Sequence, residues 1–392
     1  MAGLLSVDEA LQAVLARAAS LAAETVPLSG AAGRVLAEPA RAVVDLPPFP
    51  SSAMDGFAVR AGDTPGRLPV VDRVAAGRPA SRPLAPGEAM EISTGGVVPD
   101  GADSVVPIEL VTVDGDGVEI PDAASAGANV RPRGGDVVAG WVVVAAGVRI
   151  GPAQIGALAA AGVGELTCTR RPRVAILTTG TELRQPGESL APGEIYESNG
   201  AMLRALLGAA GAEVESFEPV EDDESAHRQA IERGLEHDVL VTSGGVSVGP
   251  HDLVRGIEAD LGVEEVFWGV SVKPGKPLAF GVRGRTLVFG LPGNPVSSLV
   301  SSVLFVVPAL RALQGENDPA PSYETAELAA PIRRDPRRDE LVRARLTAAG
   351  LEPLSGQESH MIVRAAEANA LVFVPTGTDD LPAGSTARFL RI

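Results

Sequence analysis

Three glycine-rich segments with hydroxyl side chains, two of them also with a carboxylate, follow hydrophobic runs in the middle of the chain. They are TTGTEL at 178–183, TSGGVSVGPHD at 242–252 and FGLPGNPVSS at 289–298. Glycine lets backbone N–H groups approach an anion without an intervening Cβ, and a helix that begins after the turn points its positive end at the same place. One such turn is weak evidence, because any strand-to-helix turn can require glycine. Three of them predict an anion-binding crevice.

Carboxylates accompany these turns. Glu182 follows a strand-end glycine, and Asp222 and Asp252 precede predicted helices. Each aspartate could simply cap its helix, and Asp223 could do so in place of Asp222. Several carboxylates beside a phosphate site favour instead a divalent cation such as Mg²⁺, which takes oxygen ligands from carboxylates and phosphates.

Two lysines flank a Pro-Gly turn in KPGKP, residues 273–277. A single lysine in such a loop is usually solvated, but Lys273 and Lys276 beside a crevice in an acidic chain favour an anion clamp. GLPGNP has a complete structural interpretation as a helix start, with Asn294 as the N-cap and Pro295 at the first helical position. The same geometry would make that helix start an anion site.

Two polar segments occur earlier in the chain. PPFPSSAMDGFAVR at 47–60 presents Asp55, either in a tight Asp-Gly turn or at the tip of an extended loop. NVRPRGGD at 129–136 offers Arg131 and Arg133 to an anion and Asp136 as a hydrogen-bond acceptor or a neighbour of a metal.

The elements that must position these residues alternate between strand and helix from residue 171 to 319. Strand-like runs such as VAILTTG, EVESFEPV and DVLVTSGG are separated by helical segments, and NGAMLRALLGAAGA begins with Asn199 as its expected N-cap. Such alternation predicts parallel βαβ units, whose strands end at one edge where ligands bind. The glycine-rich turns are therefore expected to lie together.

The flanking segments have other patterns. Residues 6–23 predict a helix that begins with a capping box of Ser6 and Glu9, and residues 152–162 predict a short one. Valine-rich runs between glycine and proline turns predict β structure over most of 26–170 and from 320 onward. The fold class is α/β plus β-rich domains. The expected boundaries are an N-terminal helix (1–25) packing on the α/β domain, a linker subdomain (26–44 and 145–170), an inserted β-rich domain (45–144), the α/β domain (171–319) and a C-terminal β domain (320–392).

Composition excludes several classes of protein. The net charge of −17, from 33 basic and 50 acidic side chains, and the 3% aromatic content argue against nucleic acid and anionic membrane as partners. The single cysteine, Cys168, excludes an internal disulfide, and four histidines without ligand spacing argue against zinc. The N-terminus lacks the pattern of a signal peptide, and the longest apolar run, SSLVSSVLFVVPAL, is judged too short to span a bilayer. A cytoplasmic protein is expected.

Taken together, these segments resemble the molybdopterin molybdenumtransferase family, the MoeA-like proteins that include the E domain of gephyrin. The resemblance is carried, in the family's order, by SSAMDGFAVR, STGGVVPDGADSVV, NVRPRGGD, TTGTEL, GEIYESN, VEDD, SGGVSVGPHD, KPGKP and GLPGNPVSS. It covers the whole chain, and SAMDG, SGGVSVG, PGKP and LPGNPVS are specific as a set.

The resemblance implies an elongated homodimer with a C-terminal β-barrel, which inserts molybdate into adenylylated molybdopterin with loss of AMP and a requirement for Mg²⁺. The implied catalytic residues are Asp55, Thr94, Asp136, Glu182, Asp222 and Asp252, of which the last three are also candidate metal ligands. The first three would face the crevice of the partner subunit, so the active site would be shared. The implied contacts to pterin and nucleotide are Thr179, Gly180, Asn199, Ser243, Gly244, Gly245, Pro292, Gly293, Asn294 and Pro295. The implied contacts to molybdate are Ser247, Lys273, Lys276, Arg343 and Ser359.

The chain departs from the family pattern at three positions: Gly269 replaces a common lysine, Gly135 a common glutamate and Phe57 a common tyrosine. The glycine at 269 would weaken oxyanion binding or favour another oxyanion, such as tungstate. Two other functions stay open. One is adenylylation of molybdopterin, whose enzyme shares the SGG loop, and the other is a dimeric, gephyrin-like scaffold without catalysis.

Overall fold

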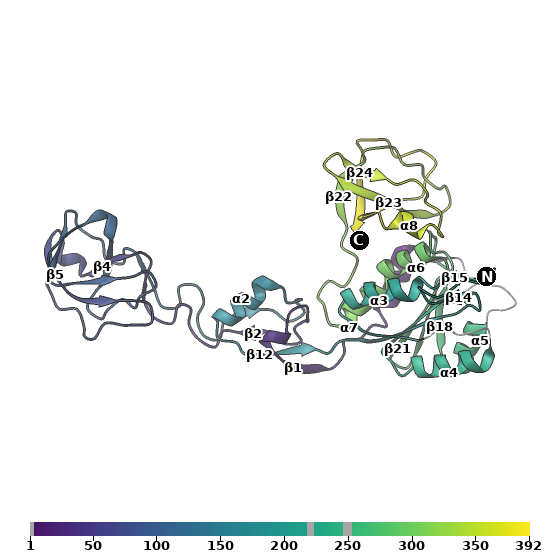
Figure 1. Ribbon diagram of the computed structural model, residues 1–392, viewed down its shortest axis with the longest axis horizontal. Coiled ribbons are helices and arrows are strands. Elements are labelled where there is room, and N and C mark those ends of the chain that lie inside the picture. The colour runs from purple at the N-terminus through teal and green to yellow at the C-terminus, as the bar shows by residue number, and fades with distance from the viewer. Residues whose placement is uncertain (1–3, 218–222, 246–252) are drawn as a thin grey trace.

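The structure, a computed structural model, describes residues 4–217, 223–245 and 253–392. The chain is elongated, with a β-rich lobe at one end and a narrow middle segment around α2 (Pro152–Ala160) (Figure 1). At the other end, an α/β domain lies against a second β domain, and both ends of the chain lie there. The predicted fold class, α/β plus β-rich domains, is confirmed.

The α/β domain is built on a six-stranded sheet with the order β16-β13-β17-β21-β20-β18. Its strands are β13 (Arg173–Thr178), β16 (Glu213–Ser216), β17 (Val239–Ser243), β18 (Glu264–Trp268), β20 (Ala279–Arg283) and β21 (Thr286–Leu291). The first four in spatial order are parallel, as predicted, whereas β20 runs antiparallel to both of its neighbours, β21 and β18. Only two residues, Gly284 and Arg285, join β20 to β21, and so short a connection requires an antiparallel hairpin.

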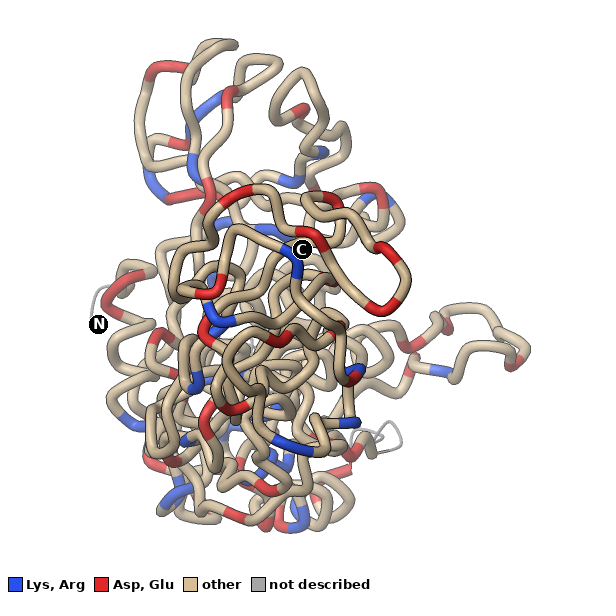
Figure 2. Tube along the Cα trace, turned by 90° about the vertical axis from the view of Figure 1, so that its left-hand side faces the viewer, with Lys and Arg blue, Asp and Glu red and all other residues tan. Residues whose placement is uncertain are grey.

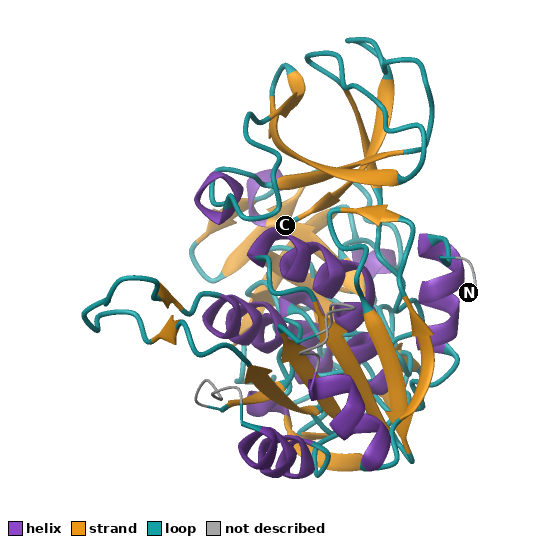
Figure 3. Cartoon of the chain, turned by 90° about the vertical axis from the view of Figure 1, so that its right-hand side faces the viewer, coloured by secondary structure: helices purple, strands orange, loops and turns teal. Residues whose placement is uncertain are grey.

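Helices cover both faces of this sheet (Figure 3). On one face, α1 (Val7–Leu15), α3 (Asn199–Ala209), α6 (Pro295–Ser301) and α7 (Val307–Leu313) pack on the sheet residues Val174, Val241 and Phe289. On the other face, α4 (Glu224–Gly234) and α5 (Leu253–Asp260) pack on Leu177 and Leu240. Consecutive strand residues thus contribute to opposite cores, as the pleat requires.

Helix α1 has the predicted capping box, because the Ser6 hydroxyl accepts from the N–H of Glu9 and the Glu9 carboxylate accepts from the N–H of Ser6. The helix ends at Leu15, so the prediction of a helix over 6–23 was too long. After the helix, Leu21 donates its backbone N–H to the carbonyl of Leu313. The N-terminal segment is thereby fastened to the α/β domain.

A continuous helical segment, Pro295–Leu313, combines α6, a π-helical turn η4 (Ser302–Val306) and α7. By length and composition it could cross a membrane, so the sequence-based judgement that this run is too short was wrong. Of the most apolar stretch of this helical segment, 72% is buried inside the protein. Val300, Leu304 and Phe305 belong to the α/β core. Its hydropathy is that of a core helix.

The β-rich lobe contains a separate six-stranded sheet with the order β7-β4-β6-β5-β9-β8. Its strands are β4 (Gly56–Val59), β5 (Gly66–Val74), β6 (Ala89–Ile92), β7 (Ser104–Pro107), β8 (Thr112–Asp114) and β9 (Gly117–Ile120), with 3₁₀ turns η2 (Ala61–Asp63) and η3 (Ile108–Leu110). Two hydrophobic clusters, one containing Phe57 and Val118 and the other Met90 and Val105, form its interior. The lobe therefore has its own core.

In the middle segment, the outgoing and returning passages of the chain pair with each other. The pairs are β1 (Ala23–Pro27) with β12 (Glu165–Thr169), β2 (Ala40–Arg41) with β11 (Val142–Val144), and β3 (Ser51–Ser52) with β10 (Val130–Arg131). A 3₁₀ turn, η1 (Leu28–Gly30), and α2 complete it, and α2 lies within the predicted 152–162. The domain boundaries given above stay a prediction.

The C-terminal β domain has the strand order β19-β23-β25-β26-β22, with β24 paired to β23. Its elements are β19 (Val272–Lys273), β22 (Glu324–Glu327), β23 (Asp339–Thr347), β24 (Gly350–Pro353), β25 (Ala370–Val374), β26 (Thr386–Arg391) and α8 (Ile362–Ala365). The strands follow an open path that curls around a core containing Val342 and Phe389, so the implied barrel is a half-barrel (Figure 3). Because β19 belongs to the KPGKP turn, its pairing with β23 connects this domain to the α/β domain.

Acidic and basic residues are interspersed along the chain rather than separated on two faces (Figure 2). The net charge of −17 is therefore spread over the molecule. A lysine or arginine that binds an anion in this protein must be helped by donor groups close to it. The net negative charge of the whole molecule does not attract anions.

Candidate functional site

The three glycine-rich turns meet at one edge of the α/β sheet, as the sequence predicts. Thr178, Ser243 and Leu291, the last residues of β13, β17 and β21, are register partners in adjacent strands. The turns are also bonded to one another. The N–H of Thr179 donates to the carbonyl of Ser243 (3.2 Å), and the N–H of Gly244 donates to the carbonyl of Leu291 (3.2 Å). These bonds hold the turns in one crevice.

Asn199 connects the turns at the start of α3. Its Nδ2 donates to Ser243 Oγ (2.8 Å) and to the carbonyl of Gly293 (2.8 Å). The side chain is 9% exposed, and its Oδ1 is buried without a hydrogen-bond partner among the residues that the structure describes. The expectation that Asn199 is the N-cap was wrong, since the cap is Ser198 and the amide spans the crevice instead. A buried acceptor therefore stands open to a ligand that carries N–H groups.

Gly244 is required by both conformation and space. Its φ is +99°, and a Cβ at this position would lie 2.7 Å from Oγ1 and 2.9 Å from the carbonyl oxygen of Thr179. Gly293 faces it across the crevice, because a Cβ on Gly293 would lie 3.8 Å from the Cα of Gly244. Two backbones thus approach each other closely where side chains would otherwise fill the crevice.

A cavity of about 320 Å³ adjoins this crevice at the ends of β13 and β16. It is lined by Thr178, Glu197 and Arg204, among others. The Glu197 carboxylate is 7% exposed and accepts the N–H of Gly200 (2.8 Å), while Arg204 donates from Nε to Ser216 Oγ (3.1 Å). Sequence analysis did not single out Glu197 or Arg204. The sequence signal that points to Arg204 is its helical spacing. It lies four residues after Gly200 on α3, so the two positions share one face of the helix.

The predicted carboxylate group is described only in part. The Glu182 carboxylate lies against Gly180, where a Cβ would be 2.7 Å from Oε2. Asp222, Asp252 and the oxyanion candidate Ser247 lie outside the described residues. Asp223, in contrast, caps α4 with its side chain, as the alternative interpretation proposed. In residues 4–217, 223–245 and 253–392, no group of three or more His, Cys, Asp or Glu side chains is arranged to hold a metal ion.

The helix start after β21 has the predicted form, with Asn294 as the N-cap of α6 and Pro295 in its first turn. Two other segments approach it. The N–H of Val296 donates to the carbonyl of Ser359 (3.0 Å), and a Cβ on Gly275 in the KPGKP turn would lie 2.8 Å from Ser301 Oγ. The structure thus brings Ser359 and the KPGKP turn to the same helix.

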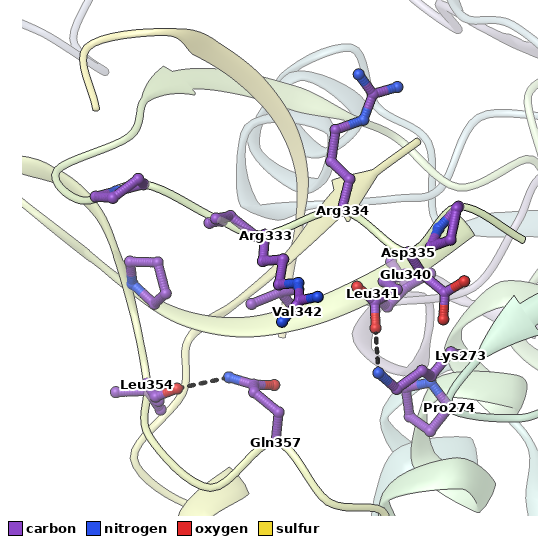
Figure 4. Close-up of a pocket in the computed structure, with 14 residues that line it drawn as sticks. Lys273, Pro274, Arg333, Arg334, Asp335, Glu340, Leu341, Val342, Leu354 and Gln357 are labelled. Carbon is purple, nitrogen blue, oxygen red and sulfur yellow. Dashed lines mark hydrogen bonds and ion pairs between the residues drawn. The ribbon is translucent and has the colours of Figure 1, made fainter. Parts of the chain in front are cut away.

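The lysines of this turn are exposed. Lys273 makes an ion pair with Glu340 of the C-terminal half-barrel (Nζ–Oε1 2.5 Å) and is directed to that domain, while Lys276 makes no ion pair within the described part of the chain. The expectation that both lysines act at the Ser243 turn is therefore not met by Lys273. The carboxylate of Glu340 is a negative partner for the ammonium group of Lys273, and the attraction between these opposite charges favours this direction (Figure 4).

Arg343, which the resemblance implies as a contact to molybdate, is 1% exposed. Its guanidinium donates to the carbonyls of Met361 (2.8 Å), Gly356 (2.6 Å) and Glu358 (3.2 Å), and burial lowers its pKa. A charge buried without an acidic partner needs such carbonyl acceptors. Arg343 therefore shapes the 356–361 loop, which carries Ser359, and its contact to molybdate stays a prediction.

Asp55 and Thr94 lie together in the β-rich lobe, as the resemblance implies. Asp55 Oδ1 accepts the backbone N–H of Thr94 (2.6 Å) and its hydroxyl (3.0 Å). These bonds, that of the backbone first, lower the pKa of the Asp55 carboxyl, so it stays ionised at neutral pH. Within one chain this lobe lies at the opposite end of the molecule from the crevice (Figure 1).

The other polar segment of the lobe is partly structural. Asp136 is exposed, and its N–H donates to the carbonyl of Leu46. Arg133, a candidate anion ligand, pairs instead with Asp45 (Nε–Oδ2 2.6 Å). The N–H of Ala139 and this guanidinium lower the pKa of Asp45. Arg133 therefore fixes the chain between the lobe and the middle segment.

Local packing explains why Gly269 stands where a lysine is common in the family. Its φ is +91°, and a Cβ would lie 2.6 Å from Leu4 Cδ2. The N-terminal segment covers the position, because the N–H of Leu5 donates to the Gly269 carbonyl and Leu5 forms a bridge with Val270. The glycine thus accommodates the N-terminal segment.

Models of three protein-family regions match the chain in succession. They are the MoeA N-terminal region (domain I and II) at 5–162, a probable molybdopterin binding domain at 175–312, and the MoeA C-terminal region (domain IV) at 325–392. Molybdopterin molybdenumtransferase 2 of Mycobacterium tuberculosis is 38% identical over 378 residues, which cover 92% of this chain and 93% of that protein. Molybdopterin molybdenumtransferase of Staphylococcus aureus is 33% identical over 392 residues, covering 97% and 94%.

Solved structures have the same architecture. The crystal structure of the molybdopterin biosynthesis moea protein from Pyrococcus horikosii superposes with a TM-score of 0.84 at 32% identity and covers 99% of each chain. A second structure of a moeA protein from Pyrococcus horikoshii OT3 gives a TM-score of 0.87 at 28% identity over 100% of each chain. The likeness therefore extends through all parts of the molecule.

Proposed function

The chain belongs to the MoeA family of molybdopterin molybdenumtransferases, enzymes of molybdenum cofactor biosynthesis, and on this premise we propose that its crevice takes adenylylated molybdopterin and molybdate and releases AMP. The observation that carries the proposal is the meeting of the three turns at Thr178, Ser243 and Leu291. Backbone N–H groups on glycine turns suit a pyrophosphate, which is the charged part of such a substrate.

The open acceptor of Asn199 supports the pterin part of the substrate. A pterin ring carries amide and amino N–H groups, and Asn199 Oδ1 is buried in the crevice without a partner in the described part of the chain. An N–H donor from the ring would satisfy this oxygen, whose isolation otherwise costs about 1–3 kcal/mol. Thr179, Gly180, Ser243, Gly244, Gly245 and the Pro292–Pro295 turn would surround the ring and the phosphates.

Mg²⁺ fits the donor set of this edge of the sheet. Glu182 lies beside Gly180, and Asp222 and Asp252 follow β16 and β17 in the sequence, so oxygen ligands of the kind that Mg²⁺ prefers would converge there. The ion would neutralise the negative charge that develops on the phosphoanhydride. The oxyanion would be held by Ser247, Lys276 and Ser359, with Lys273 at its edge.

A homodimer would complete this site. Asp55 and Thr94 form a positioned, ionised carboxylate far from the crevice of their own chain. In a symmetric dimer, the lobe of one chain can reach the crevice of its partner, so each site would combine both. There Asp55 and Asp136 would position the oxyanion or water whose oxygen attacks the phosphorus of the adenylate. With water as the attacking group, a new P–O bond would form to the adenylate phosphorus as the bond from that phosphorus to the bridging oxygen breaks. The pterin phosphate would be the leaving group, and AMP would carry the oxygen that came from water. A cytoplasmic location suits these substrates.

The test is AMP release by purified protein supplied with adenylylated molybdopterin and Mg²⁺, with and without molybdate. We expect release that depends on molybdate and is lost in Asp55→Asn. Asp72→Asn is the matched control, because Asp72 lies in the same lobe and also accepts an amide and a hydroxyl, both from Ser81 (3.0 and 2.8 Å). Equal release without molybdate, or wild-type turnover of Asp55→Asn, would contradict the proposal.

A further inference from the structure

A cavity of about 200 Å³ lies in the β-rich lobe, at the β7 edge of its sheet. Strand β7, the 3₁₀ turn η3, the end of β9 and the loop 122–129 form its walls. Within one chain, the lobe lies at the opposite end of the molecule from the crevice (Figure 1). Sites for drug-sized ligands have volumes of roughly 300–1,000 Å³, whereas an apolar cavity of about 150 Å³ holds benzene. A pterin or a nucleotide is therefore too large for this cavity, and a single ring fits.

The walls of the cavity are mainly aliphatic. The side chains of Val106, Leu110 and Ile120 line it together with three alanines. Val106 and Ile120 belong to one of the two hydrophobic clusters of the lobe, so the cavity adjoins a packed core. Of the wall residues that the structure describes, only Asp122 is charged, and it is exposed. Because these walls offer an anion no cationic partner, they favour a neutral molecule.

Ser104 adds one polar group to these apolar walls. It lies on β7 two residues before Val106, so both side chains are on the same face of the sheet. The residue is 0% exposed, and its hydroxyl has no hydrogen-bond partner in residues 4–217, 223–245 and 253–392. Buried hydroxyl groups normally have such a partner, and a hydroxyl can both donate and accept. A ligand that carries a hydroxyl group of its own would supply the partner.

The polar groups beside Ser104 are already engaged. The N–H of Ala124 in the loop donates to Thr64 Oγ1 (2.8 Å). Asn129, at the end of the same loop, donates from Nδ2 to the carbonyl of Val105 (2.9 Å). These bonds hold the loop against β7, so the cavity is formed before a ligand enters it.

The turn η3 connects the cavity to Asp55. Its last residue, Leu110, lines the cavity and is 62% exposed, and its first residue, Ile108, donates its N–H to the Asp55 carbonyl (3.1 Å). We propose that the cavity binds a small neutral molecule with a single ring and one hydroxyl group, which bonds to Ser104 and packs on Leu110. Such a ligand holds η3 in place and thereby stabilises the Asp55 turn. This binding site does not depend on the reaction proposed above.

The test is a titration of the protein with phenol, followed by the NMR signals of the Leu110 and Ile120 methyl groups. Toluene, a ring without a hydroxyl group, and 4-hydroxybenzoate, which adds a negative charge, are the comparison compounds. We expect phenol to shift both methyl signals and 4-hydroxybenzoate to shift neither. Phenol should also slow amide hydrogen exchange at Ile108.

Ser104→Ala should weaken phenol binding about fivefold, the loss of one hydrogen bond, and leave toluene binding within about twofold of wild type. Ser125→Ala is the matched control, because Ser125 lines the same cavity but is exposed. It should leave both affinities within about twofold. Ser104→Ala removes a buried polar atom that has no partner in the described part of the chain, so its thermal midpoint should not fall below that of wild type.

Phenol that leaves both methyl signals unmoved, or that binds Ser104→Ala as tightly as wild type, would overturn the assignment. An equal loss of affinity in Ser125→Ala would do the same. If Ser104→Ala proves less stable than wild type, Ala128→Leu, which fills the cavity, decides instead. Phenol should then shift neither methyl signal, and retained binding would place phenol elsewhere. Unchanged exchange at Ile108 in the presence of phenol would refute the connection to Asp55.

Discussion

Replacing Asn199 by leucine tests how the crevice is held together. Leucine has nearly the shape of asparagine, so the change removes hydrogen bonds without leaving a hole. Ser243 Oγ is buried and would lose its donor, at about 1–3 kcal/mol, and the half-buried bond to Gly293 contributes about 1 kcal/mol. The free energy for local opening of the turns should therefore fall by about 2–4 kcal/mol.

The assay is amide hydrogen exchange at Thr179 and Gly244, whose N–H groups bond across the turns. A loss of 2 kcal/mol or more predicts exchange at least about 30-fold faster at both amides. Asn317→Leu is the control, because its amide donates to a carbonyl, that of Ala146, at an exposed position remote from these turns. Unchanged exchange at Thr179 and Gly244 in Asn199→Leu would refute the reasoning that this amide holds the crevice.

Three further predictions follow from the contacts of individual residues. Thr94→Val removes one of the two hydrogen bonds that lower the pKa of Asp55, so this pKa should rise. The acidic limb of the pH–rate profile should then move to higher pH. If the limb does not move, the ionisation of Asp55 does not control the rate. Gly269→Lys should lower the thermal midpoint rather than tighten molybdate binding, because a side chain at φ +91° costs roughly 1–2 kcal/mol and meets Leu4; a tighter Kd with an unchanged midpoint would contradict this. Arg343→Leu should destabilise the C-terminal half-barrel by roughly 2–5 kcal/mol, seen as faster proteolysis of that domain, since three carbonyls lose a charged donor; wild-type resistance would show that they find other donors.

Much of the α/β domain could be predicted because its signals are local. Hydrophobic runs that end in glycine gave β13, β17 and β21, and Asn294 with Pro295 gave the start of α6. The common edge followed from the rule that parallel strands end together. The hairpin of β20 and β21 was missed because the alternation of strands and helices stops there.

The functions of individual side chains were less predictable. Asn199 has the residue type of an N-cap, but a bridge from α3 to two distant turns depends on tertiary packing. Arg343 is charged, which favours a ligand role, whereas its burial depends on how β23 meets the 356–361 loop. Lys273 likewise found its partner, Glu340, in another domain. Spacing in the sequence does not contain such contacts.

We propose that each active site combines the crevice of one chain with the Asp55 lobe of its partner. This proposal is tested most directly by mixing Asp55→Asn, altered in the lobe, with Asn199→Leu, altered in the crevice, so that subunits exchange. Each variant alone is expected to lose activity, and molybdate-dependent AMP release is measured before and after mixing. A mixed dimer then has one doubly altered site and one intact site, so random mixing should restore about a quarter of wild-type activity in a symmetric dimer. If the mixture stays as inactive as its components, each site lies within a single chain and the claim is wrong.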